Sequence, residues 1–129
     1  MIAILGNNEV ARRHVNQIAD FGGDLIWYKE QPDKINPNVE CWIVTCYKAV
    51  NDFYQFDGKP VLYRSPTSNG YIYDVQSVFP NVTYSAVFDA KPLETSKIFK
   101  VSGVSEQCHY WVRKLTDFFP IDPEWVEIN

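Results

Sequence analysis

The first part of the chain combines short apolar runs with one helical repeat of apolar residues. Residues 2–5 form an apolar run that predicts a buried strand. Residues 10–20 follow a period of three to four, which predicts an amphipathic helix. The apolar face of this helix consists of Ala11, Val15, Ile18 and Ala19. Phe21-Gly22-Gly23 predicts the end of the helix, because glycine readily adopts the left-handed conformation that closes helices.

Four further apolar runs predict strands at residues 24–28, 41–46, 60–64 and 82–88. The run at 41–46 is apolar without alternation, which is typical of a strand covered on both faces of a parallel sheet. Shorter helical patterns lie between these runs, at residues 49–56 and 72–79. Residues 97–101 fit either a strand or a loop, and residues 125–128 fit either an edge strand or a docked tail.

The clearest helical pattern of the chain begins at Ser105, which predicts an N-cap. Apolar residues then recur every three or four positions, and Pro120 ends the pattern. The predicted apolar stripe consists of Cys108, Trp111, Val112, Leu115, Phe118 and Phe119.

Strands that are separated by helices imply parallel pairing, because the chain must cross back over the sheet between neighbouring strands. The 129 residues have the length of one domain. We therefore expect a single α/β domain, a compact three-layer sandwich with a mostly parallel sheet of about five strands. Its general order resembles the Rossmann-like and flavodoxin-like folds. The alternative is an α+β domain with an antiparallel second half.

Composition excludes several classes of protein. The formal net charge of −4 disfavours general nucleic-acid binding, which needs an excess of Lys and Arg to displace phosphate counterions. Residues 2–5 are too short for the core of a signal peptide, and no run approaches the roughly 18 apolar residues of a membrane span. We therefore expect a cytoplasmic protein in which Cys41, Cys46 and Cys108 are reduced thiols.

In an open parallel sheet, ligands bind at the carboxyl ends of the strands, near the point where the strand order reverses. This rule gives five candidate loops, at residues 6–9, 29–31, 45–48, 65–69 and 89–91, and the first and third loops would adjoin if the first and third strands pair. The candidate ligand residues are Gly6, Asn7 and Asn8 after the first strand, Thr45, Tyr47 and Lys48 after the third, and Arg64, Ser65, Thr67, Ser68 and Asn69 after the fourth.

The turn Gly6-Asn7-Asn8 has two interpretations. Asn7 or Asn8 could cap the following helix, with Glu9 interacting favourably with the helix dipole. Alternatively, Gly6 and the first helical amides could cradle a phosphate. The dinucleotide fingerprint G-x-G-x-x-G needs three glycines, whereas this turn has one, and Glu9 would repel a phosphate at close range. Helix capping is therefore the first interpretation and ligand binding the second.

No catalytic or metal-binding motif is present. Cys46 fits a buried strand residue better than a nucleophile, and Arg64 fits a solvated charge better than an anion ligand. The spacing of Cys41, Cys46, Cys108 and His109 does not match a zinc site, so we expect no metal and no cofactor.

Two functions are consistent with these patterns. The first is binding of a nucleotide-like or phosphorylated small molecule at the strand ends. The alternative is a non-enzymatic protein-interaction module, such as an inhibitor or adaptor, for example a viral accessory protein. It would use a surface rich in aromatic residues, which often dominate binding interfaces. The residues of that surface are Tyr71, Tyr73, Tyr84, Tyr110 and Trp125.

Overall fold

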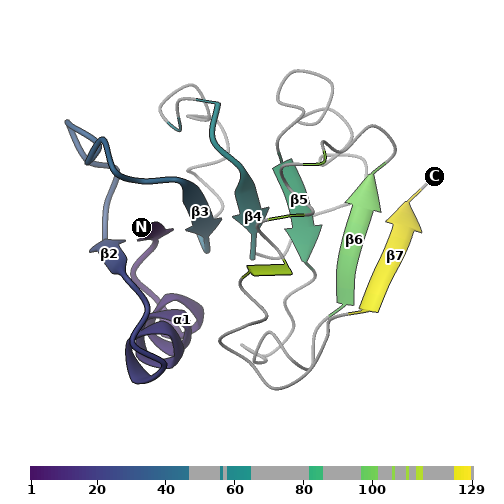
Figure 1. The fold of residues 1–129 in the computed structure, drawn as a ribbon, viewed down its shortest axis with the longest axis horizontal. Helices are drawn as coiled ribbons and strands as arrows, with labels where there is room; N and C mark the ends of the chain where they lie inside the picture. Colours follow the sequence, from purple (N-terminus) through teal and green to yellow (C-terminus); the bar gives the residue numbers. More distant parts are fainter. Residues whose placement is uncertain are drawn as a thin grey trace.

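Seven strands form one sheet in the described part of the chain (Figure 1). The computed structural model describes residues 1–46, 56, 58–64, 82–85, 97–101, 106, 110, 113, 114 and 124–128. For residues 82–85, 97–101 and 124–128, the description covers the backbone only. The strands are β1 (Ile2–Leu5), β2 (Leu25–Tyr28), β3 (Cys41–Val44), β4 (Val61–Tyr63), β5 (Val82–Ser85), β6 (Lys97–Val101) and β7 (Glu124–Ile128).

The strand order in the sheet is β2-β1-β3-β4-β5-β6-β7. β1 pairs in parallel with both β2 and β3, and β3, β4 and β5 continue the parallel pairing. β6 is antiparallel to β5, and β7 is parallel to β6. The predicted α/β fold with a mostly parallel sheet is confirmed, and residues 97–101 and 124–128 are strands. The antiparallel alternative applies only to the pairing of β5 with β6.

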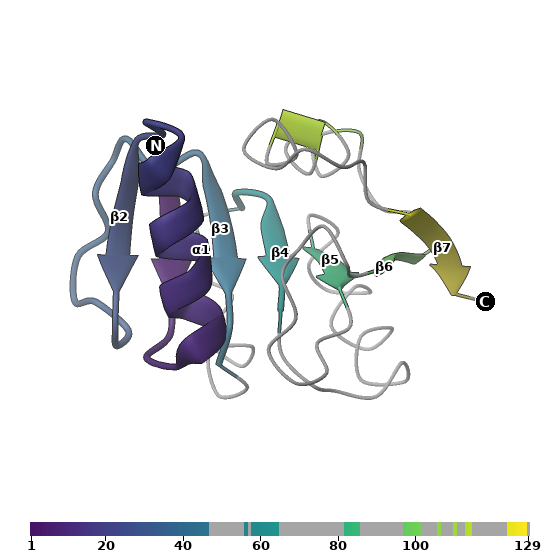
Figure 2. The ribbon, with the colours of Figure 1, turned by 90° about the horizontal axis from the view of Figure 1, so that it is seen from below.

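Helix α1 (Glu9–Asp20) connects β1 to β2 and lies against one face of the sheet (Figure 2). It begins at its N-cap Asn8, whose Oδ1 accepts a hydrogen bond from the Ala11 amide at 2.9 Å. It ends at Phe21, and Gly22 adopts a φ of +73° while its amide donates to the Ala19 carbonyl. The capping residues thus act as the sequence predicts.

A hydrophobic core fills the space between α1 and the sheet. Ile2 and Ile4 of β1, Ile43 of β3 and Ile18 of α1 are all buried in it. One position of the predicted helix face is wrong, because Ala19 is exposed and His14 is buried instead. The buried face of α1 therefore runs through positions 11, 14 and 18.

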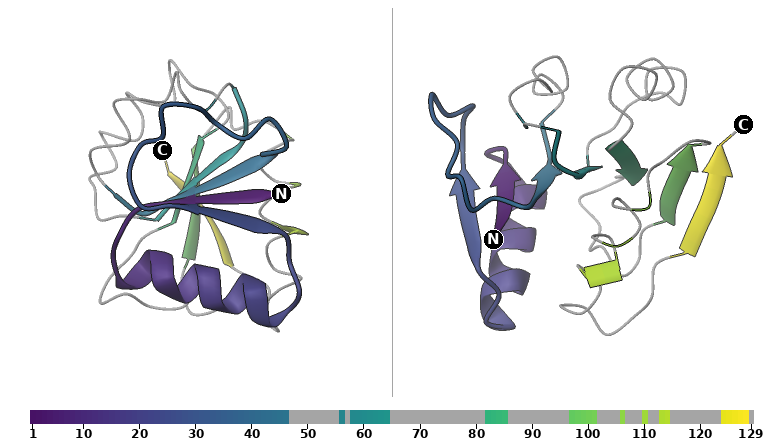
Figure 3. Two further views of the ribbon diagram at one scale, coloured as in Figure 1. Left: turned by 90° about the vertical axis from the view of Figure 1, so that its left-hand side faces the viewer. Right: turned by 45° about the horizontal axis from the view of Figure 1, so that its top comes forward.

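The opposite face of the sheet is covered differently. Residues 29–40 lead from the end of β2 to the start of β3, past β1, and run over the face that α1 leaves open (Figure 3, left). A parallel crossover normally uses a helix, but this segment contains none. Trp42, which alternates with Cys41 and Ile43 along β3, lies on this second face.

The remaining predicted helices lie almost entirely outside the described residues. Glu106, Tyr110, Arg113 and Lys114 have helical backbone and exposed side chains, as expected for the polar side of the predicted final helix. Within the described ranges, no helix combines the length and the apolar character that a membrane span requires.

Candidate functional site

The pairing of β1 with β3 brings Gly6 and Thr45 together at the carboxyl ends of both strands. The Thr45 amide donates to the Leu5 carbonyl at 2.9 Å, and the Thr45 hydroxyl donates to the same oxygen at 3.0 Å. Strand order reverses here, because β2 lies on one side of β1 and β3 on the other. The predicted adjacency of the first and third loops is confirmed.

Gly6 is required by the close approach of Thr45. Its φ is +139°, a backbone conformation that residues with a side chain rarely adopt, and a Cβ atom at this position would collide with Thr45 Oγ1. The Gly6 amide donates to the Tyr28 carbonyl at 2.9 Å, and its carbonyl accepts from Trp27 Nε1 at 2.8 Å. Glycine at this turn is therefore explained by the packing of β1, β2 and β3.

Asn8 joins the start of α1 to β3. While its Oδ1 caps the Ala11 amide, its Nδ2 donates to the Thr45 carbonyl at 3.0 Å. Helix capping, the first interpretation of this turn, is confirmed. Ligand binding by the same turn is compatible with it, because capping uses the side chain of Asn8 and leaves other amides of the first helical turn available.

Two of these amides belong to Glu9 and Val10. The Ala11 and Arg12 amides donate to the side chain and the carbonyl of Asn8, respectively. For the amides of Glu9 and Val10, the described part of the chain provides no acceptor. Such amides, together with the helix dipole, favour an anion at a helix N-terminus.

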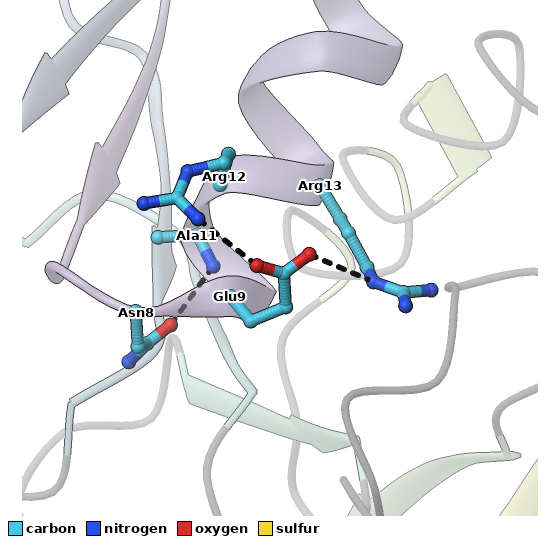
Figure 4. Close-up of polar contacts among 5 residues, drawn as sticks. All are labelled: Asn8, Glu9, Ala11, Arg12 and Arg13. Carbon is cyan, nitrogen blue, oxygen red and sulfur yellow. Dashed lines mark hydrogen bonds and ion pairs between the residues drawn. The ribbon is translucent and has the colours of Figure 1, made fainter.

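The Glu9 carboxylate lies between two arginines of its own helix (Figure 4). It forms ion pairs with Arg12 at 3.0 Å and with Arg13 at 3.6 Å. The formal charge of the three side chains together is positive. The negative charge of Glu9 is balanced on the surface of α1.

Arg64 is not the solvated charge that the sequence suggests. It is 1% exposed, and its Nε donates a hydrogen bond to His14 Nε2 at 3.1 Å. This bond connects the end of β4 to the buried side of α1. Burial, together with the neighbouring Arg64 guanidinium, lowers the pKa of His14 from 6.5 to about 3. His14 is therefore neutral at pH 7 and can accept this hydrogen bond.

Sequence reasoning missed His14 because it assigned the buried face of the helix to apolar residues. The spacing of Ala11, His14 and Ile18 is itself helical, and it was the signal that could have placed His14 inside. A buried histidine needs a polar partner, and Arg64 supplies one.

The other predicted site residues, Tyr47, Lys48, Ser65, Thr67, Ser68 and Asn69, lie outside the described residues. Of the predicted aromatic surface, Tyr110 is 55% exposed; Tyr71 and Tyr73 lie outside the described residues, and the side chains of Tyr84 and Trp125 are not described. Cys41 is buried and Cys46 half-buried. Within the described ranges, no group of three His, Cys, Asp or Glu side chains could hold a metal ion.

The fold is similar to those of several oxidoreductases. A 3-hydroxyacyl-CoA dehydrogenase from Archaeoglobus fulgidus matches with a TM-score of 0.69 at 7% identity over 99% of this chain. A reductive aminase from Aspergillus terreus in complex with NADPH matches with a TM-score of 0.65 at 11% identity over 98% of this chain. A protein from Arthrobacter sp. described as an F420-dependent NADP reductase gives 0.63 at 14% identity over 98% of this chain and 83% of its own length.

This chain spans only 56% of the dehydrogenase and 54% of the reductive aminase. No protein-family model matches it, and no curated protein matches its sequence. At these identities the similarity establishes the Rossmann-like α/β fold alone.

The strand order supports this assignment. A classic dinucleotide-binding sheet has the order 3-2-1-4-5-6. The order β2-β1-β3-β4-β5 is this arrangement without strand 3, because residues 29–40 lead directly from β2 to β3. It is also the flavodoxin-like order 2-1-3-4-5, so it fits both doubly wound folds that the sequence resembles. The switch point between β1 and β3 is retained.

We predict that Gly6→Ala destabilises the protein more than Gly22→Ala does. Both glycines have a positive φ, but nothing lies within 4 Å of a Cβ at Gly22. Gly22→Ala should cost about 1–2 kcal/mol through backbone strain alone, and the collision with Thr45 should add about 1–3 kcal/mol for Gly6→Ala. Urea denaturation measures both. Equal losses would show that the contact between Gly6 and Thr45 is not formed in solution.

We also predict that stability falls as the pH is lowered from 6.5 towards 3 because His14 remains neutral in the folded protein. The unfolded chain binds a proton on His14 below its ordinary pKa, so acid favours unfolding by up to about 1.4 kcal/mol per pH unit. His14→Gln keeps an acceptor for Arg64 but does not titrate. Urea denaturation between pH 7 and pH 5 should therefore give a steeper pH dependence for the wild type; parallel curves would contradict the assignment.

Proposed function

We propose that the protein binds a dinucleotide phosphate of the NADPH type at the carboxyl ends of β1 and β3, with the phosphates on the N-terminus of α1. The observation that carries this proposal is the pair of amides, Glu9 and Val10, that have no acceptor among the described residues and lie at the switch point of the sheet. Nucleotide phosphates bind such amides in doubly wound folds.

Electrostatics around these amides support an anionic ligand. Arg12 and Arg13 flank the Glu9 carboxylate on the first turns of α1, and both are exposed. An approaching phosphate therefore meets a local excess of positive charge, in addition to the positive end of the helix dipole.

Lys29 supports a phosphorylated ribose. It directly follows β2, and its Nζ lies 4.7 Å from the centre of the Trp27 ring. In dinucleotide-binding domains the ribose of the adenosine half lies near the end of the second strand, where a cation accommodates a 2′-phosphate. The fold similarity to a reductive aminase in complex with NADPH agrees with this choice of ligand.

Gly6 does not serve the ligand in this proposal. Its Cβ position is taken by Thr45, and its carbonyl is bound by Trp27, so the phosphates are held by the helical amides instead. This arrangement explains why a single glycine is sufficient where the usual fingerprint has three. We propose binding and assign no reaction to the site.

The test compares Glu9→Pro with Glu9→Ala. Both variants remove the carboxylate, but only proline removes the Glu9 amide proton. Proline is well tolerated at the first helical position, and the extended backbone of Asn8 (φ −151°, ψ −180°) suits a residue before proline. In isothermal titration calorimetry, Glu9→Pro should bind NADPH about 10–100-fold more weakly than Glu9→Ala does. This difference corresponds to the loss of one hydrogen bond to a charged group.

Equal affinities in the two variants would contradict the role of the Glu9 amide. Failure of the wild-type protein to bind NADPH would contradict the proposed function and favour the protein-interaction alternative. Circular dichroism of both variants is the control, since each should keep the helix content of the wild type.

A further inference from the structure

A cavity of about 710 Å³ lies on the face of the sheet opposite α1. Its walls are the crossover loop, from Gln31 to Val39, together with Trp42 of β3, Phe56 and Lys59. This volume is within the range of roughly 300–1,000 Å³ that small-molecule sites occupy.

The cavity results from the way this face is covered. Residues 29–40 cross from β2 to β3 without a helix (Figure 3, left). A helix fills the space above a sheet with regularly spaced side chains, whereas an irregular crossover that contains Pro32 and Pro37 does not. The cavity is therefore specific to this shortened crossover, which begins at the carboxyl end of β2.

The loop is nevertheless held in place. The Asn36 amide donates to the Tyr28 hydroxyl at 2.9 Å, and the Glu40 amide donates to the Met1 carbonyl at 3.0 Å. Tyr28 also stacks on Trp42, with ring centroids 5.7 Å apart. These contacts fix the loop to the first two strands and give the cavity a defined wall.

Aromatic and aliphatic side chains form the base of the cavity. Trp42 is fully buried, Phe56 and Val39 are nearly so, and the Trp42 and Phe56 rings lie 4.7 Å apart. The charged side chains among the lining residues are Asp33 and Lys59, whose formal charges cancel. Such a lining suits a flat, uncharged molecule.

Three buried polar atoms in this lining have no hydrogen-bond partner among the described residues. They are Trp42 Nε1, Gln31 Oε1 and Gln31 Nε2. Buried polar groups in folded proteins are nearly always paired, and a ligand in this cavity would supply partners for an indole donor and a whole carboxamide.

We propose that this cavity binds a neutral planar heterocycle of the nucleobase type. A glutamine carboxamide can pair with the edge of a purine through one donor and one acceptor, as it does with adenine in nucleic-acid recognition. The Trp42 N–H then donates to a ring nitrogen, while the ring itself packs against Phe56 and Val39. The site does not depend on the dinucleotide proposal, since none of the observations behind it involves the amides of Glu9 and Val10.

Adenine is the probe, and the indole N–H signals in a ¹H–¹⁵N correlation spectrum are the readout. Trp42→Phe identifies the signal of Trp42, and Trp27, whose Nε1 donates to Gly6, reports separately on the strand ends. Adenine should move the Trp42 signal downfield at millimolar concentration or below and leave Trp27 unchanged. N6,N6-dimethyladenine, which lacks the exocyclic donors, should bind at least 10-fold more weakly.

A matched pair of variants locates the site. Gln31→Leu should weaken adenine binding at least 10-fold, whereas Gln17→Leu, the same change on α1, should have no effect. An unmoved Trp42 signal, equal binding of the two purines, or equal effects of the two variants would each overturn the proposal. Loss of NADPH binding with retained adenine binding would contradict only the strand-end function.

Discussion

The close approach of β3 to the end of β1 is the contact on which the rest of the structure depends. The amide and the hydroxyl of Thr45 both donate hydrogen bonds to the Leu5 carbonyl. The Thr45 side chain also occupies the space that a Cβ atom at position 6 would need. Because the chain turns at Gly6 without a side chain, Asn8 can cap α1 and also bind the Thr45 carbonyl. One steric requirement thereby sets the position of the helix N-terminus relative to the switch point of the sheet.

The two faces of the sheet differ in how they are covered. Under α1 the core is closed and neutral His14 accepts a hydrogen bond from buried Arg64, while Gln17 Oε1 of the same helix has no partner among the described residues. Under the crossover loop the packing is incomplete, and the unpartnered atoms of Gln31 and Trp42 occur there. The difference follows from the connections: α1 links adjacent strands, whereas residues 29–40 must pass β1 without a helix.

Much of the N-terminal half could be predicted from the sequence because its signals are local. Asn8 and Gly22 mark the ends of α1, and the apolar runs mark the strands. The roles of Arg64 and Gly6 could not be predicted, since both depend on contacts between residues far apart in the chain. Local sequence does not show that α1 brings His14 to Arg64, or that Thr45 lies beside Gly6. The cavity was missed because apolar periodicity describes elements and gives no information on the volume between them.

The central claim is that the N-terminus of α1, held at the switch point by Gly6, Asn8 and Thr45, is an anion site for a dinucleotide. Mapping backbone amide chemical shifts during a titration with NADPH tests it most directly. The account predicts that the amides of Glu9 and Val10 shift most, with smaller changes at Lys29 and none at β7. Shifts that are largest at β6 and β7, or along the crossover loop, would contradict it.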